Sequence, residues 1–165
     1  MLELSAVVSV LGVLAAIAVP ALLRHIRRSR AAEAAEMLDQ MYRGSAAYVV
    51  QQTEGSGTVA VSFPASEGPT PAEACCHHDD GHCHPDEATW ASPTWAALGF
   101  APVTPHRYQF SYLSAEQGTA AHFTARVTGD LDCDNQRSVF ERTGTLDQEL
   151  NLQPGRGIFS HSPLE

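Results

Sequence analysis

A run of uncharged residues, from Leu4 to Leu23, lies near the start of the chain and is the feature that most restricts its fold. At about 1.5 Å per residue, a helix of this length extends about 30 Å, which is the hydrocarbon thickness of a bilayer. Arg residues follow directly, at positions 24, 27, 28 and 30. A cleaved signal peptide has the reverse order, with its basic residues before the apolar run. The segment therefore predicts a membrane-anchoring helix.

The charge distribution separates this beginning from the rest of the chain. Residues 1–30 carry four Arg and one Glu, whereas the net charge of the whole chain is −9. Proteins that bind duplex nucleic acid normally carry a basic face, so the acidic remainder offers no direct evidence for such a partner. The chain has no Lys, which excludes Schiff-base and P-loop chemistry.

The residues within the apolar run carry a more specific pattern. Gly12 follows Glu3 by nine residues, Pro20 follows Gly12 by eight, and Pro20 closes the sequence AAIAVP. This segment resembles the N-terminal segment of type IV pilins and of the pseudopilins of type II secretion. The family Glu usually stands fifth in the mature chain and here stands third, so either two residues precede Met1 or this member has a shorter start. The resemblance covers roughly the first thirty residues.

The resemblance implies how the chain assembles and where it is located. Glu3, Gly12 and Pro20 are its assembly residues, and Glu3 is expected to meet the amino terminus of a neighbouring subunit. Related filaments unwind after the Gly, so non-helical backbone is expected within 13–19 in the filament. The implied location is a single pass through the inner membrane, followed by an extracellular filament on the cell surface. This placement of the head disagrees with the Arg cluster, which by itself marks the cytoplasmic side, and the resemblance overrides the Arg count.

The apolar periodicity extends the helix beyond Pro20. Ala and large apolar residues recur at spacings of three and four residues up to Tyr42, and Gly55 and Gly57 end the pattern. We expect a long helix over 1–52, of which 1–23 is the hydrophobic part, and a globular head over 53–165. Residues 53–105 are rich in Gly, Pro, Ser and Thr and predict a long loop, with a short helical turn at 94–98.

The sheet of the head is predicted from alternating residues. Three segments, 106–113, 119–128 and 137–142, alternate apolar and polar residues and are joined by short linkers. A last short strand is expected near 146–152, and the remainder is expected to be a tail. The predicted fold class is α+β, with a long N-terminal helix packed on a small antiparallel sheet over 106–152.

The cysteines lie in the long loop and in one turn. Cys75, Cys76 and Cys83 share the sequence ACCHHDDGHCHP with four His, and Cys133 lies in an acidic turn. In an oxidising compartment four Cys form two disulfides. A bridge between the adjacent Cys75 and Cys76 is strained, so two pairings stay open, and each links the loop to the turn. A metal ion bound by the histidines alone is compatible with both.

The acidic turn matches a metal-binding template. Asp130, Asp132 and Asp134 alternate, and Glu141 follows Asp130 by eleven residues, as in the loop D-x-D-x-D-G-x5-E, with Asn135 in place of Gly. Two interpretations stay open, a calcium site and a solvated β-turn. The predicted function requires no cofactor, and calcium is the cation that this pattern admits.

The predicted function is that of a structural subunit rather than an enzyme, because no catalytic motif is present. The expected partners are identical subunits in a helical homopolymer, the inner membrane before assembly, and the pilus assembly machinery. The alternatives are a pseudopilin of a type II secretion system and a membrane-anchored periplasmic metal-binding module.

Overall fold

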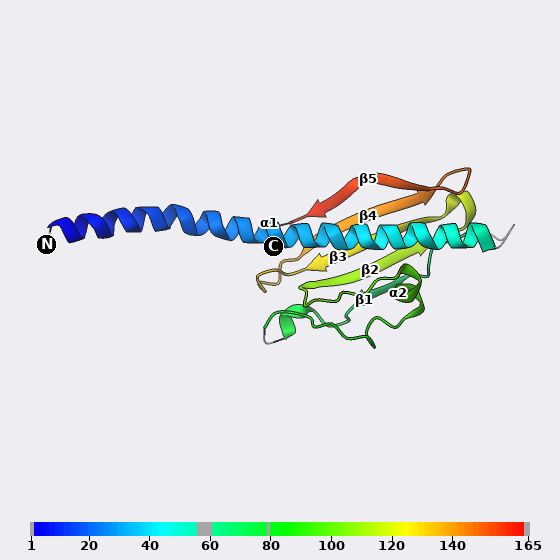
Figure 1. Ribbon diagram of the computed structural model, residues 1–165, viewed down its shortest axis with the longest axis horizontal. Helices are drawn as coiled ribbons and strands as arrows, with labels where there is room; N and C mark the ends of the chain where they lie inside the picture. Colours follow the sequence, from blue (N-terminus) through cyan, green and yellow to red (C-terminus); the bar gives the residue numbers. More distant parts are fainter. Residues whose placement is uncertain (1, 56–60, 79, 164–165) are drawn as a thin grey trace.

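The computed structural model describes residues 2–55, 61–78 and 80–163. One long helix, α1 (Leu2–Gly55), runs alongside a five-stranded sheet for only part of its length, and its N-terminal part projects beyond the head (Figure 1). The helix is continuous through Pro20. The protein is therefore an α+β chain with a long N-terminal helix and an antiparallel head.

The sheet is an antiparallel meander in the order β1-β2-β3-β4-β5. Its strands are β1 (Glu67–Thr70), β2 (Tyr108–Ala115), β3 (His122–Gly129), β4 (Ser138–Leu146) and β5 (Leu152–His161). A short helix, α2 (Pro93–Leu98), and two single 3-10 turns, η1 (Cys75–His77) and η2 (Gly118–Ala120), lie in the connections. The helical turn predicted at 94–98 corresponds to α2.

Two strands differ from the sequence-based prediction. β1 lies within the segment predicted to be a loop, and β5 begins where the last strand was expected to end. β1 has only four residues, and β5 contains Pro154, Gly155 and Gly157, residues that weaken a strand pattern. Both are the outer strands of the sheet, where Pro is tolerated because one side of the strand needs no ladder hydrogen bond.

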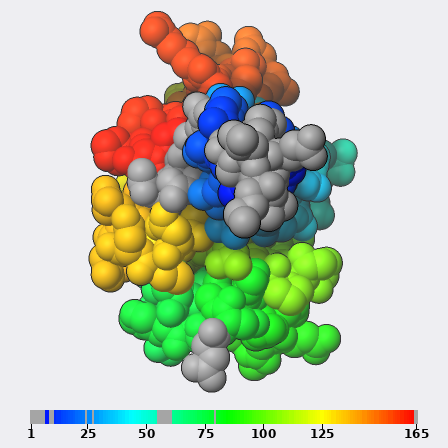
Figure 2. Space-filling view, turned by 90° about the vertical axis from the view of Figure 1, so that its left-hand side faces the viewer, coloured from blue at the N-terminus to red at the C-terminus, as the bar shows by residue number. Residues whose placement is uncertain are grey.

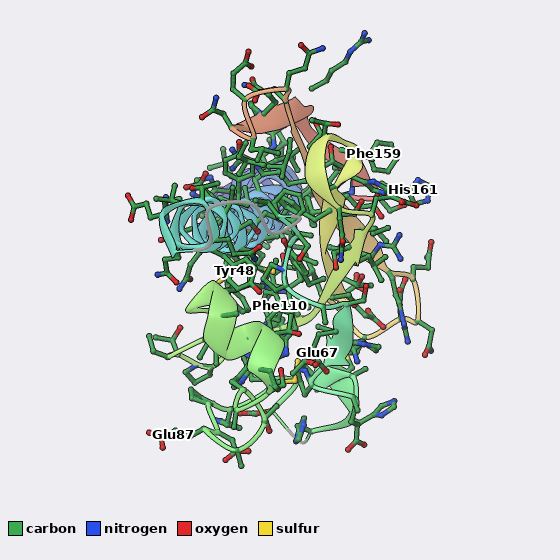
Figure 3. The ribbon with its side chains drawn as sticks, turned by 90° about the vertical axis from the view of Figure 1, so that its right-hand side faces the viewer. Tyr48, Glu67, Glu87, Phe110, Phe159 and His161 are labelled. Atoms are coloured by element: carbon green, nitrogen blue, oxygen red, sulfur yellow. A yellow bond between two sulfur atoms is a disulfide. The ribbon has the colours of Figure 1, made fainter. Side chains whose placement is uncertain are left out.

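The core lies between α1 and the inner face of the sheet. Along β2 and β3 alternate residues are fully buried, which matches the predicted alternation, and on α1 the buried residues recur every three or four positions. Figure 3 shows Phe110 between the helices and the sheet, and Phe159 on the opposite side of the sheet. The buried residues of α1 are Ala34, Leu38, Met41, Ser45 and Val49.

The contact between α1 and the head also contains specific polar interactions. The Ser45 hydroxyl donates to the carbonyl oxygen of Met41 at 2.9 Å and lies 2.8 Å from the hydroxyl of Tyr112, all of it buried. Arg142 on β4 pairs with Asp39 and stacks over the ring of Tyr42, 4.0 Å from its centroid. These contacts determine which face of α1 meets the sheet.

The predicted location is wrong in its first step. Among the residues that the structure describes, no helix combines the length and the apolar character needed to cross a bilayer. A single-pass anchor needs about 20 consecutive, predominantly apolar residues. This finding overturns the expectation of an inner-membrane single pass.

Candidate functional site

The projecting half of α1, residues 2–29, carries a large apolar surface. The large apolar side chains described here between positions 7 and 23 are each 52–68% exposed. Figure 2 looks at the molecule from the end where this half projects, in blue. Monomeric proteins rarely expose contiguous apolar surface on this scale, and such surfaces mark interaction sites. These side chains are Val7, Val8, Leu11, Val13, Leu14, Ile17, Val19, Leu22 and Leu23.

Polar contacts between α1 and the head lie further along the helix, beyond its projecting half. An Arg30 guanidinium nitrogen donates to the carbonyl oxygen of Leu131 at 2.6 Å, and the Tyr108 hydroxyl donates to the carbonyl oxygen of Arg30 at 2.8 Å. At the other end, the Gln52 side chain donates to and accepts from the backbone of Ser62. The head therefore holds α1 from Arg30 to Gln52.

The three predicted assembly residues all belong to the projecting half. Glu3 is in helical backbone, and its side chain lies outside the described residues. Gly12 is in open space, since a Cβ atom placed on it would meet nothing within 4 Å. Pro20 lies inside the helix. The surface around Gly12 is thus open to close approach by another helix.

Two disulfides hold the long loop. Cys75 pairs with Cys83, and Cys76 pairs with Cys133. This is one of the two pairings that the sequence left open. The Cys75–Cys83 bond closes a small ring within the loop, whereas the Cys76–Cys133 bond ties that ring to the turn between β3 and β4, 57 residues away in sequence.

The histidines beside these cysteines lie in polar surface contacts. Nε2 of His84 lies 2.9 Å from a carboxylate oxygen of Asp80, and Nδ1 of His82 lies 2.8 Å from the Asp80 carbonyl oxygen. The His82 backbone N–H and the His84 side chain both bond the Asp80 carboxylate and lower its pKa. Among the described residues, none of the four histidines His77, His78, His82 and His84 belongs to a group of three side chains placed to bind a metal.

The acidic turn brings together three of its four predicted ligands. Carboxylate oxygens of Asp130, Asp132 and Asp134 lie within 4.8 Å of one another. The Asp130 carboxylate accepts the backbone N–H groups of Asp134 and Asn135, at 3.1 and 2.9 Å, and Asn135 has the positive φ (71°) expected at the sixth template position. A compact turn therefore gathers alternate carboxylates.

Glu141 does not belong to this group. It lies on β4 opposite Arg126 of β3, and an Arg126 nitrogen donates to its carboxylate at 2.6 Å. The template of a helix-flanked calcium loop fails at this position because the chain enters β4 at Ser138, and an extended strand carries position 141 away from the turn.

One buried polar residue gained no functional role from the sequence. His106 lies at 1% exposure beside Trp90 and Phe110. Its Nδ1 has no hydrogen-bond partner, and burial lowers its pKa to about 4. The ring is therefore neutral at neutral pH. Its spacing of two from Tyr108 was the available signal that it faces the core.

Comparison of the chain with protein-family models, with curated proteins and with solved structures gives no match.

Proposed function

We propose that this chain is the structural subunit of a helical filament of the type IV pilin class, in which the projecting halves of α1 from identical subunits pack against one another. The observation that carries the proposal is the exposed apolar surface of residues 7–23, on a helix whose other half is fixed to a folded head. A long helix beside an antiparallel, disulfide-linked head also agrees with a pilin-like fold.

The energy available from this surface is large enough for assembly. Burying the exposed half of a Val, Leu or Ile side chain contributes about 1 kcal/mol, so the nine side chains together offer roughly 10 kcal/mol. Association costs about 4–15 kcal/mol in lost translational and rotational freedom. One helix pair is therefore marginal, whereas a filament, in which each helix contacts several neighbours, is stable.

The residues that resemble the family pattern have distinct roles in this proposal. The Glu3 carboxylate pairs with the amino terminus of a neighbouring subunit as both are desolvated. The open surface at Gly12 lets the helices approach closely. Pro20 has no backbone N–H to donate within the helix, which lets the segment between Gly12 and Pro20 unwind in the filament. Removing one member of a buried ion pair typically costs about 3–5 kcal/mol, so Glu3→Ala is expected to abolish filaments.

The test compares apolar-to-charged changes on the projecting half of α1 with such a change on the head, each made in the full chain. Leu14→Asp with Ile17→Asp places charge on the projecting half. Val103→Asp places charge on a loop of the head, at a residue that is 85% exposed. Each protein is purified in mild detergent, the detergent is removed, and filaments are measured by sedimentation and electron microscopy. We expect filaments from the wild type and Val103→Asp, and none from the double variant, with equal melting temperatures of the three heads.

Two results bear on the alternatives. If the Leu14/Ile17 double variant forms as many filaments as the wild type, packing through α1 is contradicted. If Glu3→Ala forms as many filaments as the wild type, the pilin class is contradicted, whereas packing through the helices is not. A pseudopilin of a type II secretion system uses the same packing. Deleting the gene distinguishes a pilin from a pseudopilin, because a secretion defect without loss of surface filaments favours the pseudopilin.

A further inference from the structure

Three buried side chains that can bind a metal converge behind the loop. Cys83 and His106 face each other in an isolated antiparallel bridge, in which the Cys83 N–H donates to the His106 carbonyl at 2.8 Å and the His106 N–H donates back at 3.0 Å. Cys75 reaches the same point. The two sulfurs and one ring nitrogen of His106 lie within 4.8 Å of one another, and the three residues are 3%, 3% and 1% exposed.

The His106 ring is not explained by packing alone. Its Nδ1 is buried and has no hydrogen-bond partner, and aromatic rings of Trp90 and Phe110 lie around it with centroids at 6.1 and 5.3 Å. An unsatisfied buried polar atom costs about 1–3 kcal/mol. An apolar residue would fill this position without that cost. The unsatisfied Nδ1 therefore suggests a state of the protein in which this ring nitrogen has a partner.

We propose that reduction of the Cys75–Cys83 disulfide creates a binding site for a thiophilic d10 cation of the Zn²⁺ or Cu⁺ class, held by both thiolates and the His106 ring. A dithiol supplies the two electrons and two protons that convert the disulfide to two thiols, and it becomes a disulfide itself. The cation then displaces two protons from the thiols. Reoxidation of the pair by a disulfide-class oxidant releases the cation.

The geometry suits these ions. Zn–S and Zn–N bonds of about 2.3 and 2.0 Å place neighbouring ligand atoms of a tetrahedral ion about 3.5–4 Å apart. The two sulfurs, bonded to each other in the disulfide, must separate to this distance once the bond is reduced, and the His106 nitrogen lies within 4.8 Å of both. With three protein ligands, one position of the ion is left to water. The second disulfide, Cys76–Cys133, keeps the loop attached to the β3–β4 turn while the ring closed by Cys75 and Cys83 is open.

The experiment uses full-length variants in which only one cysteine pair remains. Cys76→Ala with Cys133→Ala keeps the proposed ligands, and Cys75→Ala with Cys83→Ala is the matched control with the other pair. Each is reduced with a phosphine, freed of reductant without oxygen, and titrated with Cd²⁺, whose thiolate charge-transfer absorption reports binding. Zn²⁺ competition then gives the affinity. We expect one tight equivalent in the first variant, at least tenfold weaker binding in the control, and none in the oxidised wild type.

The role of the histidine is tested separately. Adding His106→Leu to the first variant is expected to weaken binding at least tenfold, with circular dichroism as the check of folding. X-ray absorption at the zinc edge of the His106-containing variant is expected to show two sulfur ligands and a nitrogen ligand from imidazole, and it needs no further substitution. Equal affinities in the two cysteine variants, or a zinc shell without imidazole, would overturn the proposal.

Discussion

Gly44 is predicted to be essential to the contact between α1 and α2. It lies in α1, and a Cβ atom added to it would be 2.1 Å from the carbonyl oxygen of Leu98 and 2.9 Å from its carbonyl carbon. Both are backbone atoms at the end of α2, so no side-chain rotation relieves the clash. Gly44→Ala therefore forces the two helices apart by about 1 Å, the distance needed to restore ordinary contact.

Opposing effects determine the magnitude of this change. Ala is favoured over Gly in a helix by about 1 kcal/mol. A gap of about 1 Å forfeits a quarter to a half of the contact energy of the facing atoms, and Trp95 and Leu98 on α2 are both buried. Together with strain from overpacking, about 1–3 kcal/mol, the loss exceeds the gain. We expect a net destabilisation of about 2 kcal/mol, which lowers the melting temperature of a chain of this size by about 4–8 °C.

The measurement is thermal unfolding of the full chain in detergent, monitored through the near-ultraviolet circular dichroism of the tryptophans. Gly12→Ala is the control, because the same substitution in the same helix meets nothing within 4 Å. It is expected to leave the melting temperature of the head unchanged. A Gly44→Ala protein as stable as the wild type, or more stable, would refute the argument that the close approach of α2 requires Gly at this position.

Three further predictions concern the head. Ser45→Ala and Tyr112→Phe each leave a buried hydroxyl without its 2.8 Å partner and are expected to cost about 1–2 kcal/mol in urea unfolding; the double variant is expected to cost less than the sum, and strict additivity would show that the two hydroxyls are not coupled. Removing the Cys76–Cys133 disulfide, with a sequence separation of 57, is expected to cost about 1.7 kcal/mol more than removing Cys75–Cys83, with a separation of 8, because it closes the longer loop. The reverse order of melting temperatures would contradict that account. Calcium binding at the acidic turn remains a prediction from the sequence. We expect the wild type to melt at a higher temperature in calcium than in chelator, and Asp132→Ala to abolish this difference. An unchanged wild-type melting temperature would favour a solvated β-turn.

Periodic patterns of apolar residues were sufficient to predict which face of a single helix or strand is buried. The spacing of Ala34, Leu38 and Met41 predicted the buried face of α1, and the alternation of Tyr108 and Phe110 predicted the inner face of β2. These signals are readable because side-chain direction follows the period of the backbone. The outer strands β1 and β5 were missed or misplaced, since their ladders depend on a neighbouring strand more than on their own residues.

The sequence alone determined a long helix with an apolar, uncharged beginning, an antiparallel sheet and a cysteine-rich loop. Only the tertiary structure decided which cysteines pair, that Glu141 meets Arg126 instead of the acidic turn, and that His106 lies beside the Cys75–Cys83 bond. It also gave Gly44 its role, because the atom that excludes a side chain there belongs to Leu98, 54 residues further along the chain. The physical reason is that the period of a segment specifies which of its faces is buried, whereas the residues it meets depend on the path of the whole chain.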